Sequence, residues 1–388
     1  PEAPHPSSVT IFLSQIAVPR FVHSVLQFLA PPRHAPRMSK PLSRRRFLAV
    51  AGTALAVARA PATLTPPPRV MSVTGWVEAS QLGLALPHEH VTTDFLGAEQ
   101  RPAPRYDRDA AYSVIRPAFD VLAARGVKAL AECTPAHIGR DVLLLKRLSE
   151  ATGVRILTNT GYYGAVDNKF LPRHAFTETE EQLAARWLSE WRDGIEGTGI
   201  RPGFLKLGVG NGPLPDLHTK LLRAAGRVHR ETGLTIAVRT GDGEAARDEV
   251  RILRELGLAP VALIWVHAQN DPGPVQLELA RRGAWISLDG YSLATRNPER
   301  YRNMLLAHKE AGTLGRVLIS HDDGWAVEGE AATGATLKLF GNGNPKPYTS
   351  IFDRLLPDLR AAGFTEDEIR QLTVLNPAQA LSVTVRTI

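Results

Sequence analysis

Cysteine and aromatic residues are scarce in this sequence. The 388 residues include one cysteine, Cys133, which excludes both a disulfide framework and a cysteine-rich zinc module. Aromatic residues make up 6% of the chain, a content that disfavours a protein that binds nucleic acid by stacking on its bases. No partner base is evident beside Cys133, so we expect a small buried residue there rather than a nucleophile.

The body of the chain also lacks an excess of positive charge. The formal net charge is +7, but residues 1–60 contain eight basic residues and one acidic residue and so carry all of it. The remaining residues contain 38 basic and 38 acidic side chains. A neutral body offers no basic surface for phosphate backbones or anionic lipids. We therefore expect a small-molecule substrate and no nucleic-acid partner, and the sequence leaves a homodimer open.

The N-terminal region has no apolar run long enough to span a bilayer. Residues 43–60 read SRRRFLAVAGTALAVARA, in which an arginine pair precedes a short alanine-rich run. This pattern resembles a twin-arginine export signal, so residues 38–60 are predicted to form a disordered leader that directs export to the periplasm without stable membrane insertion. The alternative is a disordered basic tail. Residues 1–37, which precede the first methionine, are predicted to be a non-native upstream extension, and residues 61–72 a proline-rich linker.

From residue 73 to the end of the chain, short apolar runs alternate with charged helical segments. Eight runs are candidate strands: 83–91, 127–134, 154–163, 204–210, 234–240, 261–268, 284–290 and 316–321. Glycines stand at expected helix C-caps, where a left-handed backbone favours them: Gly126, Gly153, Gly233, Gly257, Gly283 and Gly312. The pattern predicts an α/β fold, a (β/α)8 TIM barrel over residues 73–388. A doubly wound open sheet is the alternative, but no glycine-rich phosphate loop follows the first strand.

Polar side chains fall at the predicted carboxyl ends of these strands, where barrels of this type carry their chemistry. His88 and His90 close the first strand, and their i, i+2 spacing points both imidazoles the same way. His267 ends the sixth strand and Asp322 the eighth. Imidazoles and a carboxylate on separate rigid strands predict a site for a divalent transition metal such as zinc.

Lys206 lies within the fourth predicted strand, where an inward-facing ammonium is costly unless it is paired. Desolvation and nearby positive charge favour the neutral, nucleophilic amine. Such an amine can add carbon dioxide and become a carbamate that bridges two cations as a carboxylate does. The alternative is an ion pair between Lys206 and Glu132, at the end of the second strand.

These residues and their surroundings resemble the phosphotriesterase family of the amidohydrolase superfamily, from about Thr74 to the C-terminus. The matching stretches are LPHEHV, ECTPAHIGRDVLLL, NTGYY, GFLKLG, WVHAQND, SHDDGW and the closing Leu375-Asn376-Pro377. The resemblance implies a two-zinc hydrolase whose activated water cleaves a carbonyl or phosphoryl centre. It implies that a first metal takes His88, His90 and Asp322, and that a second takes His267 and a strand-5 histidine. It also implies that carboxylated Lys206 bridges the two metals and that Asp322 accepts the proton.

The chain departs from the family pattern on the fifth strand, where Arg239 stands in place of the expected histidine. Arginine does not deprotonate in proteins and is no metal ligand. Four outcomes are left open. The site holds one metal ion, it holds a second one weakly, Arg239 binds an anionic group of the substrate, or the arginine is a substitution confined to this one sequence. Asn270 and Gly290 replace a relay Asp and His, which argues against high organophosphate activity. Tyr163 is expected either to line the substrate pocket or simply to pack.

The sequence therefore predicts an exported metal-dependent hydrolase that cleaves an ester, lactone, amide or phosphoester bond. The rival hypothesis, which Arg239 motivates, is a metal-impaired barrel that acts as a mononuclear enzyme or as a non-catalytic ligand-binding protein. Two further polar residues lie near these strand ends, and each has alternative roles. Asp289 is either a relay acid or the cap of a turn. His321 contacts the ligands or packs behind them, with a role as a ligand as the less favoured alternative.

Overall fold

The computed structural model describes residues 67–388, apart from 101–103, 293–297, 330–333 and 341–345. The predicted upstream extension and export leader therefore lie outside the described residues. Strand β1 (Arg69–Ser72) pairs antiparallel with β2 (Gly75–Glu78), so the folded domain begins inside the segment predicted to be a linker. In the described part of the chain, no helix has both the length and the apolar character needed to cross a membrane.

Each of the eight predicted runs contains a parallel strand. The strands are β3 (Ala85–Glu89), β5 (Ala129–Glu132), β6 (Arg155–Leu157) with β7 (Asn159–Thr160), β8 (Phe204–Gly208), β9 (Ile236–Arg239), β10 (Leu263–Val266), β11 (Trp285–Leu288) and β12 (Val317–Ile319). They pair in chain order, β3-β5-β6 in one sheet and β7 to β12 in another. The prediction of an α/β fold with a parallel sheet is confirmed.

The predicted closed barrel is borne out only in part, because the two sheets do not join into one ring. The third run is interrupted at Thr158, where the ladder passes from β5–β6 to β7–β8. No backbone ladder pairs β12 with β3. The His88 amide instead donates a hydrogen bond to a side chain, Ser320 Oγ, at 3.1 Å. Beyond it the Asp322 amide donates to the His88 carbonyl at 3.3 Å. The gap between these strands therefore falls at the level of the predicted site.

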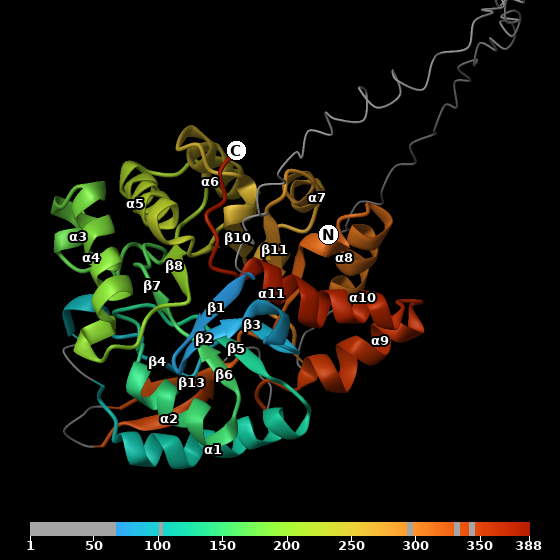
Figure 1. Cartoon of the computed structure of the whole chain (residues 1–388), viewed down its shortest axis with the longest axis horizontal. Helices are drawn as coiled ribbons and strands as arrows, with labels where there is room; N and C mark the ends of the chain where they lie inside the picture. The colour runs from blue at the N-terminus through green and yellow to red at the C-terminus, as the bar shows by residue number, and fades with distance from the viewer. Residues whose placement is uncertain (1–66, 101–103, 293–297, 330–333, 341–345) are drawn as a thin grey trace, which may run out of the picture. The chain divides into compact units, whose positions relative to one another are not determined.

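Helices surround the strands (Figure 1). Those that connect successive strands are α1 (Arg108–Ala124), α2 (Val142–Thr152), α3 (His174–Thr177), α4 (Glu180–Asp193), α5 (Asp216–Thr232), α6 (Gly243–Glu255), α7 (Pro274–Arg281) and α8 (Pro298–Glu310). The predicted glycines lie at positive φ, from 68° at Gly312 to 106° at Gly283, because a left-handed residue ends the preceding helical turn or the turn before the next strand.

Alternate residues of the strands separate two buried layers. Ala129, Ala131, Ile264 and Val266 belong to the inner layer, and Cys133 lies among them, buried as predicted. The intervening residues of each strand, such as Leu130 and Trp265, pack against the helices. This period of two follows from the strand geometry.

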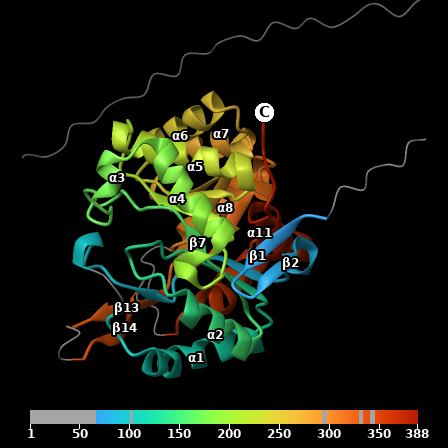
Figure 2. The ribbon, with the colours of Figure 1, turned by 60° about the vertical axis from the view of Figure 1, so that its left-hand side comes forward.

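The last part of the chain adds structure around this sheet. Strand β13 (Gly324–Glu328) pairs with β14 (Thr336–Phe340) and with the short β4 (Thr92–Thr93). Figure 2 shows β13 and β14 together beside α1. The last helices are α9 (Leu356–Ala361), α10 (Glu366–Arg370) and α11 (Asn376–Ala380). A π-helical turn at Ile351–Leu355 leads into α9, and another at Gln371–Leu375 joins α10 to α11.

Candidate metal centre

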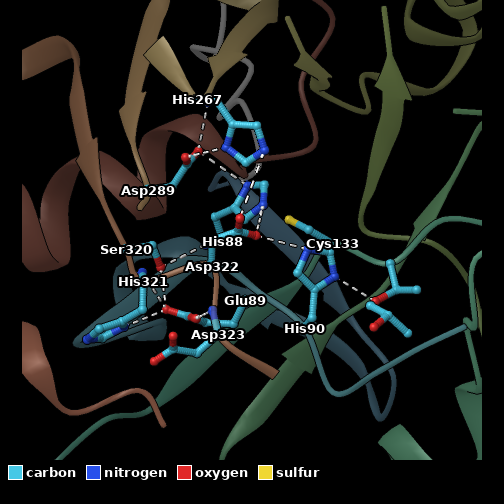
Figure 3. A network of polar contacts seen from close by, with 12 residues as sticks. His88, Glu89, His90, Cys133, His267, Asp289, Ser320, His321, Asp322 and Asp323 are labelled. Carbon is cyan, nitrogen blue, oxygen red and sulfur yellow. Dashed lines mark hydrogen bonds and ion pairs between the residues drawn. The ribbon is translucent and has the colours of Figure 1, made fainter. Parts of the chain in front are cut away.

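Four of the predicted ligands meet where β3, β10 and β12 end (Figure 3). Asp322 Oδ1 lies 3.2 Å from His88 Nε2 and 3.1 Å from His90 Nε2. Asp322 Oδ2 lies 4.0 Å from His267 Nε2. Three imidazoles, far apart along the chain, thus face one carboxylate.

The backbone at two of these residues is unusual. His267 has φ 62° and Asp322 has φ 61°, both in the left-handed region that non-glycine residues rarely adopt. Each follows the last residues of a strand, and the turn brings its side chain toward the other ligands. Such conformations cost of order 1–3 kcal/mol each and persist where the surroundings hold them, most often at functional sites.

Asp289, after β11, orients two of the histidines. Its Oδ1 accepts a hydrogen bond from His267 Nδ1 at 2.7 Å, and its Oδ2 lies 3.4 Å from His88 Nδ1. The Nε2 atoms of both rings are therefore left to face Asp322. On the other side, His90 Nδ1 is hydrogen-bonded to Thr134 Oγ1 at 2.7 Å, which likewise directs its Nε2 to the carboxylate. Partners of this kind fix the orientation of metal-ligating imidazoles.

The charge states follow from burial and from these contacts. Burial, helped by the charge of Lys206, lowers the pKa of His88 to about 4. Burial also opposes charge on His267, but Asp289 and Asp322 outweigh it and raise that pKa. Burial alone would raise the pKa of Asp322, yet His267, with His88 and His90, holds it well below the ordinary value. The site therefore combines an ionised carboxylate with a neutral His88, which are the forms that bind metal.

The donor set fits a divalent cation. Both ring nitrogens of His88 are buried and make no hydrogen bond of suitable geometry, although carboxylates lie close. Donor atoms of His88, His267 and Asp322 all lie within 4.8 Å of one another. A tetrahedral zinc site with bonds of about 2.0–2.1 Å separates its ligand atoms by about 3.3 Å. The observed spacings of 3.1 and 3.2 Å match that value.

Lys206, on β8, lines the same cavity as these residues and is 2% exposed. Its ammonium makes no ion pair or hydrogen bond with any residue that the structure describes. The Lys206–Glu132 ion pair that the sequence left open is thus not formed; Glu132 accepts instead from the Val91 amide at 3.2 Å. A buried amine without a close ion-pair partner among the described residues remains beside the histidines.

The two predicted substrate-binding residues differ in position. Tyr163 lines the cavity, and its ring also packs so closely on Gly208 that a Cβ there would lie 2.5 Å from it. Tyr163 therefore lines the cavity and packs on β8 at once, and its contact with a substrate stays a prediction. Arg239 ends β9, is half-buried, and is not among the residues that line the cavity. Its Nη1 donates to the Val209 carbonyl at 3.3 Å.

The cavity above the cluster has a volume of about 320 Å³. Apolar side chains from loops and from β14 form much of its wall: Phe95, Pro135, Ile138, Val166, Phe170 and Phe340. Lys169 also lines it, and Cys133 reaches it from the inner layer. Such a cavity suits a small molecule with an apolar part near the ligands.

The sequence analysis did not identify Glu89 or the three phenylalanines of the cavity wall, Phe95, Phe170 and Phe340, which we call the aromatic wall. Glu89, the last residue of β3, is fully buried between His88 and His90 and binds the segment that carries Asp322. Its place between His88 and His90 was the available signal, since an intervening residue of a strand faces the opposite side. His321, predicted to contact the ligands or pack behind them, is buried and bonded to Glu89. No local pattern marks Phe95, Phe170 and Phe340, which only the tertiary fold brings together.

Comparison with known proteins agrees with the resemblance. The sequence model of the phosphotriesterase family matches residues 68–381. An aryldialkylphosphatase of Saccharolobus solfataricus is 26% identical over 310 residues, 79% of this chain and 97% of the relative. An N-acetyltaurine hydrolase of Mus musculus is 26% identical over 356 residues, 81% and 98% of the two chains. The solved organophosphorus hydrolase of Deinococcus radiodurans has 30% identity and a TM-score of 0.71, covering 81% and 97%.

Proposed function

Because this chain belongs to the phosphotriesterase family, we propose that it is a metal-dependent hydrolase that cleaves an ester, lactone, amide or phosphoester bond of a small molecule. The observation that carries the proposal is the convergence of three imidazole Nε2 atoms on the Asp322 carboxylate, at the floor of a cavity of about 320 Å³. The relatives, an aryldialkylphosphatase and an N-acetyltaurine hydrolase, act on different bonds. We therefore propose a class of hydrolysed bonds and not one particular bond.

The family resemblance assigns residues to two metal ions, and the geometry supports a site by bringing donor atoms of His88, His267 and Asp322 within 4.8 Å of one another. His88, His90 and Asp322 would hold a first zinc ion, and His267 with Lys206 would face a second. Zinc, when bound, lowers the pKa of water and polarises the electrophile. We further propose that Lys206 is carboxylated, because a buried amine without an ion-pair partner is suited to take up carbon dioxide.

The chain's own groups perform the remaining work. Asp322 is ionised in the cavity and is the base that receives the proton of the attacking water. Asp289 holds His267, and with it the geometry of the site, without lining the cavity. The apolar side chains of the cavity wall lower the dielectric around the reacting bond.

Variants of the ligands test this function. His88→Ala and Asp322→Ala should abolish hydrolysis over a panel of lactones, esters, amides and phosphotriesters, because each removes a donor that the others cannot replace. Thr235→Val serves as control, since its hydroxyl bonds the Ala380 carbonyl away from the cavity. Wild-type turnover in either ligand variant would refute the assignment.

The second candidate function is a metal-impaired barrel, and Arg239 is the observation that favours it. The guanidinium ends the strand that should supply a histidine, and its described hydrogen bond goes to a carbonyl. Elemental analysis separates the hypotheses: two zinc ions per chain indicate the full hydrolase, one a mononuclear enzyme, and none a binding protein. Arg239→His should gain metal and activity if Arg239 is a lesion, and lose substrate affinity if it binds an anionic group.

Four broader proposals concern the chain as a whole. We propose that the eight strands close into a (β/α)8 barrel, since they follow one another in barrel order and β3 meets the end of β12 through Ser320 and Asp322. We also propose export through residues 38–60, which fusion to a reporter with and without Arg44 and Arg45 would test. Binding of a small molecule without nucleic acid, and a homodimer, complete the proposal.

A further inference from the structure

Glu89 lies beneath the candidate metal centre rather than in it. It stands between His88 and His90 on β3, is fully buried, and is not among the residues that line the cavity. Figure 3 shows its carboxylate facing the segment that follows β12. A carboxylate buried this completely needs partners that satisfy both of its oxygens.

Four hydrogen bonds from the described residues reach this carboxylate, all from Ser320, His321 and Asp323. Oε1 accepts from the Ser320 hydroxyl at 2.6 Å, the His321 amide at 3.0 Å and His321 Nδ1 at 2.7 Å. Oε2 accepts from the Asp323 amide at 3.0 Å. His321 Nε2 in turn accepts from the Ile351 amide at 3.1 Å, so its proton lies on Nδ1, facing Glu89.

These contacts bracket Asp322. The amide before it and the amide after it bind different oxygens of one side chain, while Asp322 itself takes φ 61°. A left-handed backbone is disfavoured for an aspartate and needs surroundings that hold it. Glu89 thus holds the backbone amides of His321 and Asp323, one on each side of Asp322.

The same carboxylate ties two strands, β3 and β12, that no backbone ladder joins. Ser320 donates to Glu89 and accepts from the His88 amide at 3.1 Å, and the His90 amide donates to the Asp323 carbonyl at 2.8 Å. The strand that carries two histidine ligands and the turn that carries the acid are thus fixed to each other through one group.

We propose that Glu89 is a positioning residue, which holds Asp322 in its left-handed conformation so that the Asp322 carboxylate faces the histidines. This inference rests on the proposed function for its effect on metal and rate. Its structural part, the holding of the turn 320–323, stands apart from that function.

Glu89→Gln is the direct variant. An amide keeps the size of the side chain, but its NH2 group in place of Oε2 would meet the Asp323 N–H, donor against donor. We expect zinc affinity, measured by competition with a chelator, to fall about 10–100-fold, the usual effect of losing an outer partner of a metal site. We also expect kcat to fall with KM nearly unchanged, and amide hydrogen exchange at His321 and Asp323 to speed up.

Asn376→Ala is the matched control. Asn376 is also fully buried, and it donates to the carbonyls of Leu314 and Val317, at the opposite end of β12. It should destabilise the protein while leaving zinc affinity and exchange at Asp323 near the wild-type values. Ser320→Ala is the second variant in case Glu89→Gln does not fold; it removes one donor to Glu89 and should give a smaller loss of zinc affinity in the same direction.

The outcomes separate this inference from the proposed function. Wild-type zinc affinity and wild-type exchange in the Glu89 variant, or equal losses in the Glu89 and Asn376 variants, would overturn the positioning role. If the wild-type protein binds no zinc and hydrolyses nothing, the proposed function fails. In that case exchange at His321 and Asp323 still decides: faster exchange in the Glu89 variant than in the Asn376 variant supports the role of Glu89, and equal exchange rejects it.

Discussion

At the scale of single residues, the site depends on side chains that fix the orientation of others. Asp289 and Thr134 each take one nitrogen of a histidine and so leave the other nitrogen to face Asp322. Tyr163 shows the same dependence through packing, because Gly208 makes room for its ring. At this scale, metal binding depends on which nitrogen of each histidine is left free to face the metal.

Gly208→Ala should disturb the cavity through Tyr163. The added Cβ would lie 2.5 Å from the ring, so the ring must move, and overpacking of this kind costs about 1–3 kcal/mol of stability. We expect KM for aryl and alkyl esters to rise as the ring shifts. Gly210→Ala is the control, because its nearest neighbour would be His218 Cε1 at 3.7 Å, an ordinary contact. Steady-state kinetics with equal KM in both variants would argue against contact between Tyr163 and substrate.

At the scale of helices and strands, the alternation of apolar runs with charged segments, and the glycines between them, were sufficient to predict much of the structure. The eight apolar runs, the glycines such as Gly153 and Gly233, and the placement of His88, His267 and Asp322 at strand ends all follow from local rules. The break at Thr158 and the hairpin β13–β14 depend on which chain segments meet, which no local pattern carries. The place of Glu89 between His88 and His90 indicates only that its side chain faces away from the ligands. Its partners lie more than 230 positions away, so the sequence did not reveal what it binds.

The caps of α1 and α2 allow a test at this scale. Asp141 caps α2 through the Leu144 amide and also accepts from Arg108 Nε at 2.8 Å and from the Tyr106 hydroxyl at 3.0 Å. Asp141→Ala should therefore lower the free energy of unfolding by about 2–3 kcal/mol, more than a cap alone. Asp107→Ala, which removes the exposed cap of α1, should cost about 1 kcal/mol. Equal losses in denaturant titrations would show that the buried contacts add nothing.

At the scale of the whole molecule, buried histidines link folding to pH. His229 donates from Nδ1 to the Leu234 carbonyl and accepts at Nε2 from the Arg386 amide, so it has no place for a second proton. Burial lowers its pKa to about 4, and burial does the same for His308. These histidines stay neutral in the folded protein where the unfolded chain, with pKa values of about 6.5, takes up protons.

The free energy of unfolding should consequently fall as pH decreases from about 6.5 to 4, because the unfolded state binds more protons in that window. The slope is at most about 1.4 kcal/mol per pH unit for each histidine. His229→Gln should flatten the dependence of stability on pH in this window, even if it lowers stability at pH 7. Denaturant titrations of the metal-free protein at a series of pH values give the slope; the same slope in wild type and variant would contradict this assignment.

The central claim is that His88, His90 and Asp322 share one metal ion, with His267 beside it. The most direct measurement is anomalous diffraction at the zinc edge from crystals of the protein grown with zinc. The account predicts a peak at about 2.0–2.2 Å from His88 Nε2, His90 Nε2 and an Asp322 oxygen, and its loss in His88→Ala. A protein that diffracts well and shows no zinc between these residues, or shows zinc only elsewhere, would contradict the account.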